Sequence, residues 1–396
     1  MVNLSVNAPT IQVSPNIGSK RLSIIDALRG ITLFGILIVH SYATFGQLDF
    51  TYELPGQFEG LNLLIDKHVG NLFSNTLYSI FSFLFGLSFA IQLQSSLSKN
   101  TPFVGRFLWR LTILMVFGYL HSLFFERDIL QMYALIGTVL VLFSNSTNKC
   151  ILASSVFCFL LAFLVVFSQD LLKTRIVLIG EALREIYLFR LIGLHRFDAY
   201  FINGRLFTIA GLFLLGLYGG KKKIFVDTSY NRWLFKKILL LSLVTIGLCF
   251  MMIQLAKAKN AQENVSITIF AVERLAQSFF YVALMVFAYK LNLFRIIADL
   301  IGQAGKMGLT TYIGQSVFLI YFYNLHPAQA IAQLQPATIV AITSAFFCLQ
   351  ISFAIWWFSK FRYGPLEWIW RSLTYLKWIP IKKMQTSEVL QNVEKQ

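Results

Sequence analysis

Long apolar segments recur along this chain, and their length constrains the fold more than any other feature of the sequence. A helix needs about 20 apolar residues to cross the hydrocarbon core of a bilayer, and several segments reach that length. Strands of a membrane barrel alternate apolar and polar residues over about 10 positions, unlike these continuous runs. Charged residues make up 13% of the chain, against about a quarter in soluble proteins. The sequence therefore predicts an all-α polytopic membrane protein.

About ten segments are candidates for transmembrane helices by length and hydropathy. In the first half of the chain they cover residues 26–46, 69–94, 103–121, 129–144 and 151–168. In the second half they cover residues 206–219, 234–255, 267–291, 307–324 and 337–358. We expect a single transmembrane domain over residues 21–380, between polar tails at residues 1–20 and 381–396.

Lysine and arginine are concentrated in alternate connections between these segments. One set is basic, as in "KKK" at residues 221–223, and the other is acidic or neutral, as in "FFERD" at residues 124–128. Because cytoplasmic loops carry the excess of Lys and Arg, both termini are predicted to be cytoplasmic. The net charge of +16 then reflects orientation and attraction to anionic membrane lipid, and we expect no nucleic-acid partner. Binding of an anionic cytoplasmic cofactor is a second use of these residues.

The segment at residues 169–203, before the sixth predicted span, has a different composition. It mixes apolar residues with charges at helical spacing. It is too charged to cross the membrane, and the spacing is typical of a helix that lies in the interface. We therefore expect one interfacial helix in this outer loop.

All five histidines fall on the outer side in this topology: His40, His68, His121, His195 and His326. Ionisable groups at membrane depth are costly and usually functional, although outer loops also tolerate histidine without any function. The four cysteines show no CxxC or Cys/His ligand spacing, so we expect neither a metal site nor a disulfide framework.

The first predicted span carries ionisable residues on one face. Asp26 and Arg29 stand near its cytoplasmic start. His40 follows Arg29 by eleven residues, which is three helical turns or about 16 Å along the axis. A simpler interpretation has Asp26 as a helix cap and Arg29 as a snorkelling side chain, but it does not explain the histidine.

A histidine and an aspartate lie close together in "VFGYLHSLFFERDILQMYALIG", residues 116–137. Asp128, with Gln131 three residues later, resembles a capping box, and His121 can simply end a helix at the interface. Alternatively, the loop joins antiparallel helices, so that both side chains face one outer cavity. The carboxylate would then orient the imidazole, as in general-base catalysis. This stretch alone leaves both interpretations open.

The C-terminal stretch "FRYGPLEWIWRSLTYLKW" predicts a cytoplasmic surface helix that starts at Pro365. Glu367 and Arg371 are four residues apart, which is a spacing typical of helical ion pairs. Tryptophan and tyrosine favour the membrane interface. The aromatic residues predicted to anchor this helix there are Trp368, Trp370, Tyr375 and Trp378.

Five stretches together resemble the YeiB-type family of bacterial inner-membrane proteins, which has a domain of unknown function and an older descriptive label of transport. They are "IDALRGITLFGIL", "FSFLFGLSFAIQL", "LHSLFFERDILQMYALIG", "AGKMGLTTYIGQS" and "FRYGPLEWIWRSLTY". The resemblance covers about residues 21–375, with the most specific signature at about residues 305–375. It implies a multi-pass protein of the bacterial inner (plasma) membrane. The chain departs from the family pattern at His40, Arg127 and Lys306, where asparagine, glycine and arginine are usual.

The "DALRG" helix followed by an "LFG" helix is more distantly similar to transmembrane acyltransferases. These include heparan-α-glucosaminide N-acetyltransferase and the bacterial O-acyltransferases of surface sugars. Such enzymes move an acyl group from cytoplasmic acyl-CoA to an acceptor on the outer side of the membrane, without a metal. Arg29-x10-His40 matches the Arg/Lys-x10-His pattern of the bacterial enzymes, and His68 stands roughly where the lysosomal enzyme keeps its catalytic histidine.

The resemblance implies specific roles for these residues. His121, oriented by Asp128, would deprotonate the acceptor, and His40 or His68 would be a second base or acyl carrier. Cytoplasmic basic residues would bind the phosphates of acyl-CoA. The candidates for substrate or cofactor binding are Asp26, Arg29, Tyr133, Gln315, Glu367 and Arg371.

Two further classes of function fit the same sequence. Buried ionisable groups also suit a proton-coupled transporter of a small molecule. Against transport, the two halves show no matching pair of helices broken by glycine or proline. A non-catalytic membrane protein is the other alternative, in which the aromatic residues only pack.

Overall fold

The computed structural model describes residues 16–45, 59–73, 76–125, 127–168, 197–259, 263–327, 330–331 and 333–383. These residues form 14 helices and no named strand, which confirms the all-α class. The first six helices are α1 (Asn16–Thr44), α2 (Gly60–Phe73), α3 (Thr76–Ser98), α4 (Val104–Ser122), α5 (Leu130–Leu142) and α6 (Asn148–Phe167). The others are α9 (Phe197–Ile202), α10 (Arg205–Lys221), α11 (Ser229–Ala258), α12 (Glu263–Ala288), α13 (Asn292–Lys306), α14 (Gly308–Leu325), α16 (Pro336–Lys360) and α17 (Pro365–Tyr375).

Six of the described helices are long and apolar enough to cross a membrane: α1, α3, α6, α11, α12 and α16. The other predicted spans fall on α4, α5, α10 and α14. Of these, α5 and α10 have 13 and 17 residues, fewer than the roughly 20 that a full crossing needs. The span predicted over residues 69–94 is divided, because α2 ends at Phe73 and α3 begins at Thr76.

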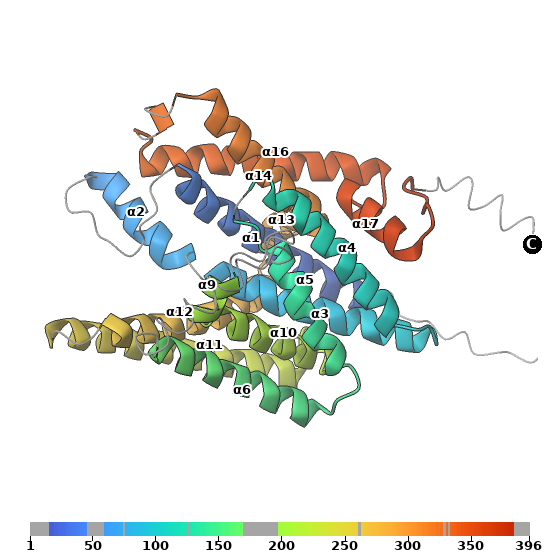
Figure 1. Ribbon diagram of the computed structural model, residues 1–396, viewed down its shortest axis with the longest axis horizontal. Helices are drawn as coiled ribbons and strands as arrows, with labels where there is room; N and C mark the ends of the chain where they lie inside the picture. Colours follow the sequence, from blue (N-terminus) through green and yellow to red (C-terminus); the bar gives the residue numbers. More distant parts are fainter. Residues whose placement is uncertain are drawn as a thin grey trace, which may run out of the picture.

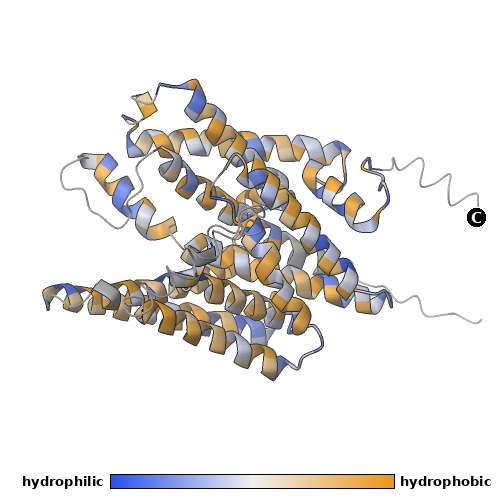
Figure 2. Cartoon of the chain, in the orientation of Figure 1, coloured by the Kyte–Doolittle hydropathy of each residue, from blue (hydrophilic) through white to orange (hydrophobic). Residues whose placement is uncertain are grey.

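The lipid-facing surface is clearest on α6 and α11, which both pack against α12 in the lower part of Figure 1. Figure 2 shows that these helices are apolar along most of their length. On α11 the exposed apolar side chains are Leu240, Leu241, Leu243, Val244, Leu248, Phe250, Met251, Met252 and Leu255. Apolar side chains exposed all along a helix are stable only against lipid or another apolar surface. This exposure agrees with the prediction that α11 spans the membrane.

Helix α13 was not predicted from the sequence, and it packs tightly against α1. A Cβ atom on Gly30 would lie 2.3 Å from the Ile301 carbonyl oxygen, and one on Gly305 would lie 2.0 Å from the Asp26 carbonyl oxygen. Only glycine permits such an approach of two helix backbones. The contact places Lys306, at the end of α13, beside the Asp26 and Arg29 end of α1.

The start of α17 at Pro365 is as predicted. Most of the predicted interfacial helix falls in residues 169–196, which lie outside the described residues, as does His195. The predicted tails also lie largely outside them, at residues 1–15 and 384–396.

Candidate functional site

The two residues singled out at the junction of α4 and α5 are in direct contact. The Nδ1 atom of His121, in the last turn of α4, lies 2.7 Å from Oδ1 of Asp128. The His121 side chain is 1% exposed and the Asp128 side chain is 2% exposed. We refer to His121 and Asp128 as the dyad.

The same carboxylate also caps α5. The backbone N–H of Gln131 donates to Oδ2 of Asp128 at 3.1 Å. The Gln131 side chain does not complete a capping box, since its Nε2 donates to the Ser122 hydroxyl at 3.4 Å. One oxygen of Asp128 therefore stabilises the start of α5, and the other contacts the imidazole. The full capping box is not formed, and the role of the pair in general-base catalysis stays a prediction.

Gly118 allows α4 to lie close to Asp128 and to the start of α5. A Cβ atom at Gly118 would lie 2.7 Å from the Gln131 backbone nitrogen and 3.0 Å from Oδ2 of Asp128. A larger residue would therefore displace the carboxylate or the start of α5. The geometry of the dyad depends on this glycine.

The second ring nitrogen of His121 is buried and has no hydrogen-bond partner among the described residues. Its ring packs between aromatic rings, with centroid distances of 5.1 Å to Phe124, 5.4 Å to Phe125 and 5.3 Å to Tyr312. His40 of α1 packs against two of the same rings, at 5.2 Å from Phe125 and 6.1 Å from Tyr312. The structure thus brings together two of the predicted histidines. An imidazole that donates from Nδ1 to a carboxylate presents a lone pair at Nε2, ready to accept a proton.

Three other predicted site residues lie elsewhere. His68 is exposed on α2. The Tyr133 hydroxyl lies 2.6 Å from the Ser82 hydroxyl and donates to the Tyr78 carbonyl at 3.1 Å, so it holds α5 to α3 within the core. Gln315 is fully buried, and its side-chain amide donates to a backbone carbonyl of α1 and to a glutamine of α16. Tyr133 and Gln315 therefore act in helix packing.

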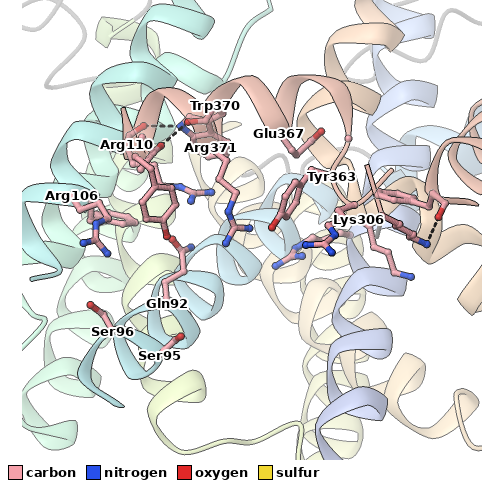
Figure 3. A pocket seen from close by; sticks show the side chains of 18 of the residues that line it. Gln92, Ser95, Ser96, Arg106, Arg110, Lys306, Tyr363, Glu367, Trp370 and Arg371 are labelled. Carbon is pink, nitrogen blue, oxygen red and sulfur yellow. Dashed lines mark hydrogen bonds between the residues drawn. The ribbon is translucent and has the colours of Figure 1, made fainter. Parts of the chain in front are cut away.

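A large cavity, which we call the basic pocket, lies between α1, α3, α4, α13, α16 and α17 (Figure 3). Its volume is about 960 Å³. The pocket lies at those ends of the helices that the charge pattern predicts to be cytoplasmic. Its basic lining residues are Arg29, Lys99, Arg106, Arg110, Lys306, Arg362, Arg371 and Lys383, and its acidic lining residue is Glu367.

The carboxylate of Glu367 is committed to another helix. It accepts the backbone N–H groups of Leu309 and Thr310, at 2.7 and 3.1 Å, and the Thr310 hydroxyl at 2.6 Å. These contacts cap the N-terminus of α14, where a negative charge is favourable. Burial raises the pKa of the Glu367 carboxyl above its ordinary value, and the hydrogen bonds from Thr310 and Leu309 oppose this effect.

The ion pair predicted between Glu367 and Arg371 is not among the described salt bridges, and this prediction is wrong. The Arg371 guanidinium instead lies over the Tyr363 ring, 4.7 Å from its centroid. Arg29, by contrast, pairs with Asp26 at 2.8 Å and donates to the Ser88 hydroxyl at 2.6 Å.

The aromatic residues of α17 contact protein groups as well as the surface. The indole N–H of Trp370 donates to the Arg110 carbonyl at 3.0 Å, and that of Trp368 donates to the Ile379 carbonyl at 2.7 Å. Trp378 is 77% exposed, as an interfacial anchor would be. Trp370 thus connects α17 to α4 beside the basic pocket.

Sequence reasoning missed several residues that line the basic pocket. Lys99, Arg106, Arg110, Arg362 and Lys383 line this pocket, and none of them was named as a binding candidate from the sequence. The available signal was their excess on one side of the membrane. What the sequence did not show was that α4 and α17 place them around one cavity.

Residues 219–377 match the model of a family described as "Protein of unknown function (DUF418)". This part of the chain is similar to the DUF418 family. The matched region begins at the end of α10 and includes α11 to α17, so it supplies Lys306, Glu367 and Arg371 to the basic pocket. The dyad and Arg106 come from the part of the chain that precedes it.

Two relatives are similar to the chain over almost its whole length. "Uncharacterized protein YxaH" of Bacillus subtilis (strain 168) is 28% identical over 411 residues, which cover 94% of this chain and 98% of the relative. "Uncharacterized 39.9 kDa protein in amylase 3'region" of Bacillus acidopullulyticus is 23% identical over 375 residues, which cover 91% and 96%. No solved structure matches the chain. The protein is a multi-pass membrane protein with bacterial relatives.

Proposed function

We propose that the protein is a transmembrane acyltransferase that moves an acyl group from cytoplasmic acyl-CoA to an acceptor on the outer side. The observation that carries the proposal is the dyad. Its His121 is buried, is oriented by a carboxylate, and has a second ring nitrogen without a partner among the described residues. That arrangement is the one a general base requires.

The proposed step transfers one proton and one acyl group. Nε2 of His121 takes the proton from an acceptor hydroxyl or amine, and the acceptor atom attacks the thioester carbonyl carbon. A new C–O or C–N bond forms and the C–S bond breaks. The leaving thiolate of CoA then takes the proton back from the imidazolium, which Asp128 stabilises in the interval. His40, which packs against the same rings, would be a second base.

The proposal includes the full predicted topology in a bacterial inner membrane. Ten spans with both termini cytoplasmic put Arg29 at the inner end of α1 and His40 about 16 Å further out. The basic pocket then faces the donor's compartment and the dyad lies toward the acceptor's. α1 lines the pocket with Arg29 and contacts the aromatic rings around the dyad with His40.

Purified protein in nanodiscs with radiolabelled acetyl-CoA tests this function. We expect the wild type to release free CoA. The rate of release from His121→Ala should be lower by a factor of about 10² or more. His326→Ala is the matched control, because His326 is an exposed histidine at the end of α14. Its turnover should equal that of the wild type.

Unchanged turnover in folded His121→Ala protein would overturn the assignment of His121 as the base. Uptake of a solute into vesicles that depends on a proton gradient, without a covalent product, would favour the transporter instead. Longer acyl-CoAs are tested in parallel, since the acyl chain is a separate variable.

A further inference from the structure

The basic pocket has a strong local excess of positive charge. Eight basic side chains line it against one carboxylate. That carboxylate, Glu367, already accepts hydrogen bonds from the start of α14, and Asp26 pairs with Arg29. No ion pair within the described part of the chain involves the remaining cations of the pocket.

Three arginines are held by aromatic rings in place of carboxylates. The guanidinium carbon of Arg110 lies 4.1 Å from the Trp370 ring centroid, and that of Arg106 lies 5.3 Å from the Tyr375 ring centroid. Arg371 lies over Tyr363 and, at 5.9 Å, over Tyr375. We call Arg106, Arg110 and Arg371 the arginine triad.

Stacking on a ring uses the face of a guanidinium and leaves the N–H groups on its edge available. Among the described residues, no hydrogen bond or salt bridge involves a guanidinium of the triad. Figure 3 shows the triad facing three polar side chains of α3, which are Gln92, Ser95 and Ser96. The donors are thus fixed in direction, and the opposite wall offers further hydrogen bonds.

The triad also carries electrostatic repulsion, which the charge of Glu367 opposes. Arg110 interacts unfavourably with the positive charges of Arg371 and Arg29. An anion between these groups would remove that cost and gain charge-assisted hydrogen bonds. Guanidinium groups match phosphate oxygens in geometry, because two parallel N–H groups can bind two oxygens.

We propose that the basic pocket binds a ligand that carries two or more phosphate groups, with the arginine triad as the primary phosphate site. Two phosphates fit a site with this many cations better than a single carboxylate does. The inference rests on the proposed function only in naming acyl-CoA as one source of such a ligand. The other source is the headgroup of an anionic lipid with two phosphates.

Binding without turnover separates this proposal from the acyltransferase. The probe is radiolabelled adenosine 3′,5′-bisphosphate, a bisphosphate related to CoA that lacks the thioester, with protein in phosphatidylcholine nanodiscs. We expect saturable binding to the wild type, weakened by salt. In Arg106→Gln and in Arg371→Gln the affinity should fall about tenfold or more. His121→Ala protein should bind as the wild type does, whether or not His121 is catalytic.

The matched control is Lys236→Gln on α11, which removes one exposed positive charge outside the pocket and should leave the affinity unchanged. Lys99→Gln is a second pocket variant, and its exposed position at the rim protects it from folding defects. Its affinity should fall by a smaller factor than that of the triad variants.

A second arm identifies the source of the phosphates. Nanodiscs doped with cardiolipin, which carries two phosphates, are analysed for lipid retained by the protein after exchange into phosphatidylcholine. Retention that is lost in Arg106→Gln and Arg371→Gln, without nucleotide binding, would support the phosphate site and assign it to lipid. The proposal is overturned if neither ligand binds, or if the triad variants bind both ligands as Lys236→Gln does.

Discussion

His121 and Asp128 are held 2.7 Å apart, Nδ1 to Oδ1, by the short connection between α4 and α5. The second oxygen of the same carboxylate accepts the backbone N–H of Gln131. One side chain therefore fixes the start of a helix and the orientation of an imidazole. Mutations at Asp128 can separate these two roles, because not every substitution removes both.

Asp128→Asn is expected to keep the helix cap and to lose the negative charge that supports His121 as a base. Asparagine caps helices about as well as aspartate, so the unfolding temperature should stay close to that of the wild type. The neutral amide does not stabilise an imidazolium, and so acyl-transfer turnover should fall about 10²-fold or more. Asp128→Ala should lower turnover and also lose about 1 kcal/mol of stability with the cap. Full turnover in Asp128→Asn would show that the carboxylate serves only the helix.

Gly118→Ala should destabilise the protein through the contact between α4 and α5. The added methyl group would lie 2.7 Å from the Gln131 backbone nitrogen, and relief of such overpacking typically costs about 1–3 kcal/mol. Gly105→Ala is the control in the same helix, since a Cβ atom there meets nothing within 4 Å. Alanine is a better helix former than glycine, so Gly105→Ala should be neutral or stabilising. Thermal unfolding in nanodiscs measures both, and equal shifts would contradict the close approach at Gly118.

Glu367 should make the stability of the α14–α17 contact depend on pH. Burial raises its pKa in the folded protein, so the folded state binds the proton more tightly than the unfolded state does. The resulting stabilisation is complete below the unfolded-state pKa of about 4.3 and is lost as pH rises through the higher folded-state pKa. The unfolding temperature of the wild type should therefore fall more than that of Glu367→Gln between about pH 4 and pH 7. Parallel curves would show that the pKa of Glu367 is the same in both states.

The positions of most helices could be predicted from the sequence, because long apolar runs identify membrane helices directly. Helix α13 was missed since it has 15 residues and one polar face, so neither its length nor its hydropathy stands out. The break between α2 and α3 was missed because apolar residues on both sides outweigh the short polar stretch Ser74, Asn75 and Thr76 in the average hydropathy. Local hydropathy does not record where a chain changes direction.

The dyad could be predicted and the basic pocket could not. His121 and Asp128 are close in sequence across one loop, so their contact depends on a local turn. Arg106 and Arg371 come from distant parts of the chain, and only the packing of α17 on α4 brings them to one cavity. The expected pair of Glu367 with Arg371 failed for a similar reason, because free N–H groups at the start of α14 compete for the carboxylate.

Tyr133 was a binding candidate in the sequence, and its hydrogen bonds to α3 assign it to packing. Tyr133→Phe removes the hydroxyl that contacts Ser82 and the Tyr78 carbonyl, and loss of such a buried bond typically costs about 1 kcal/mol. Ser82→Ala removes the other partner, and the double variant should show coupling of about 0.5 kcal/mol or more, as contacting residues do. Thermal unfolding measures the cycle, and turnover per folded molecule should stay constant in Tyr133→Phe. A raised KM for acyl-CoA with unchanged stability would instead show that Tyr133 contributes to substrate binding.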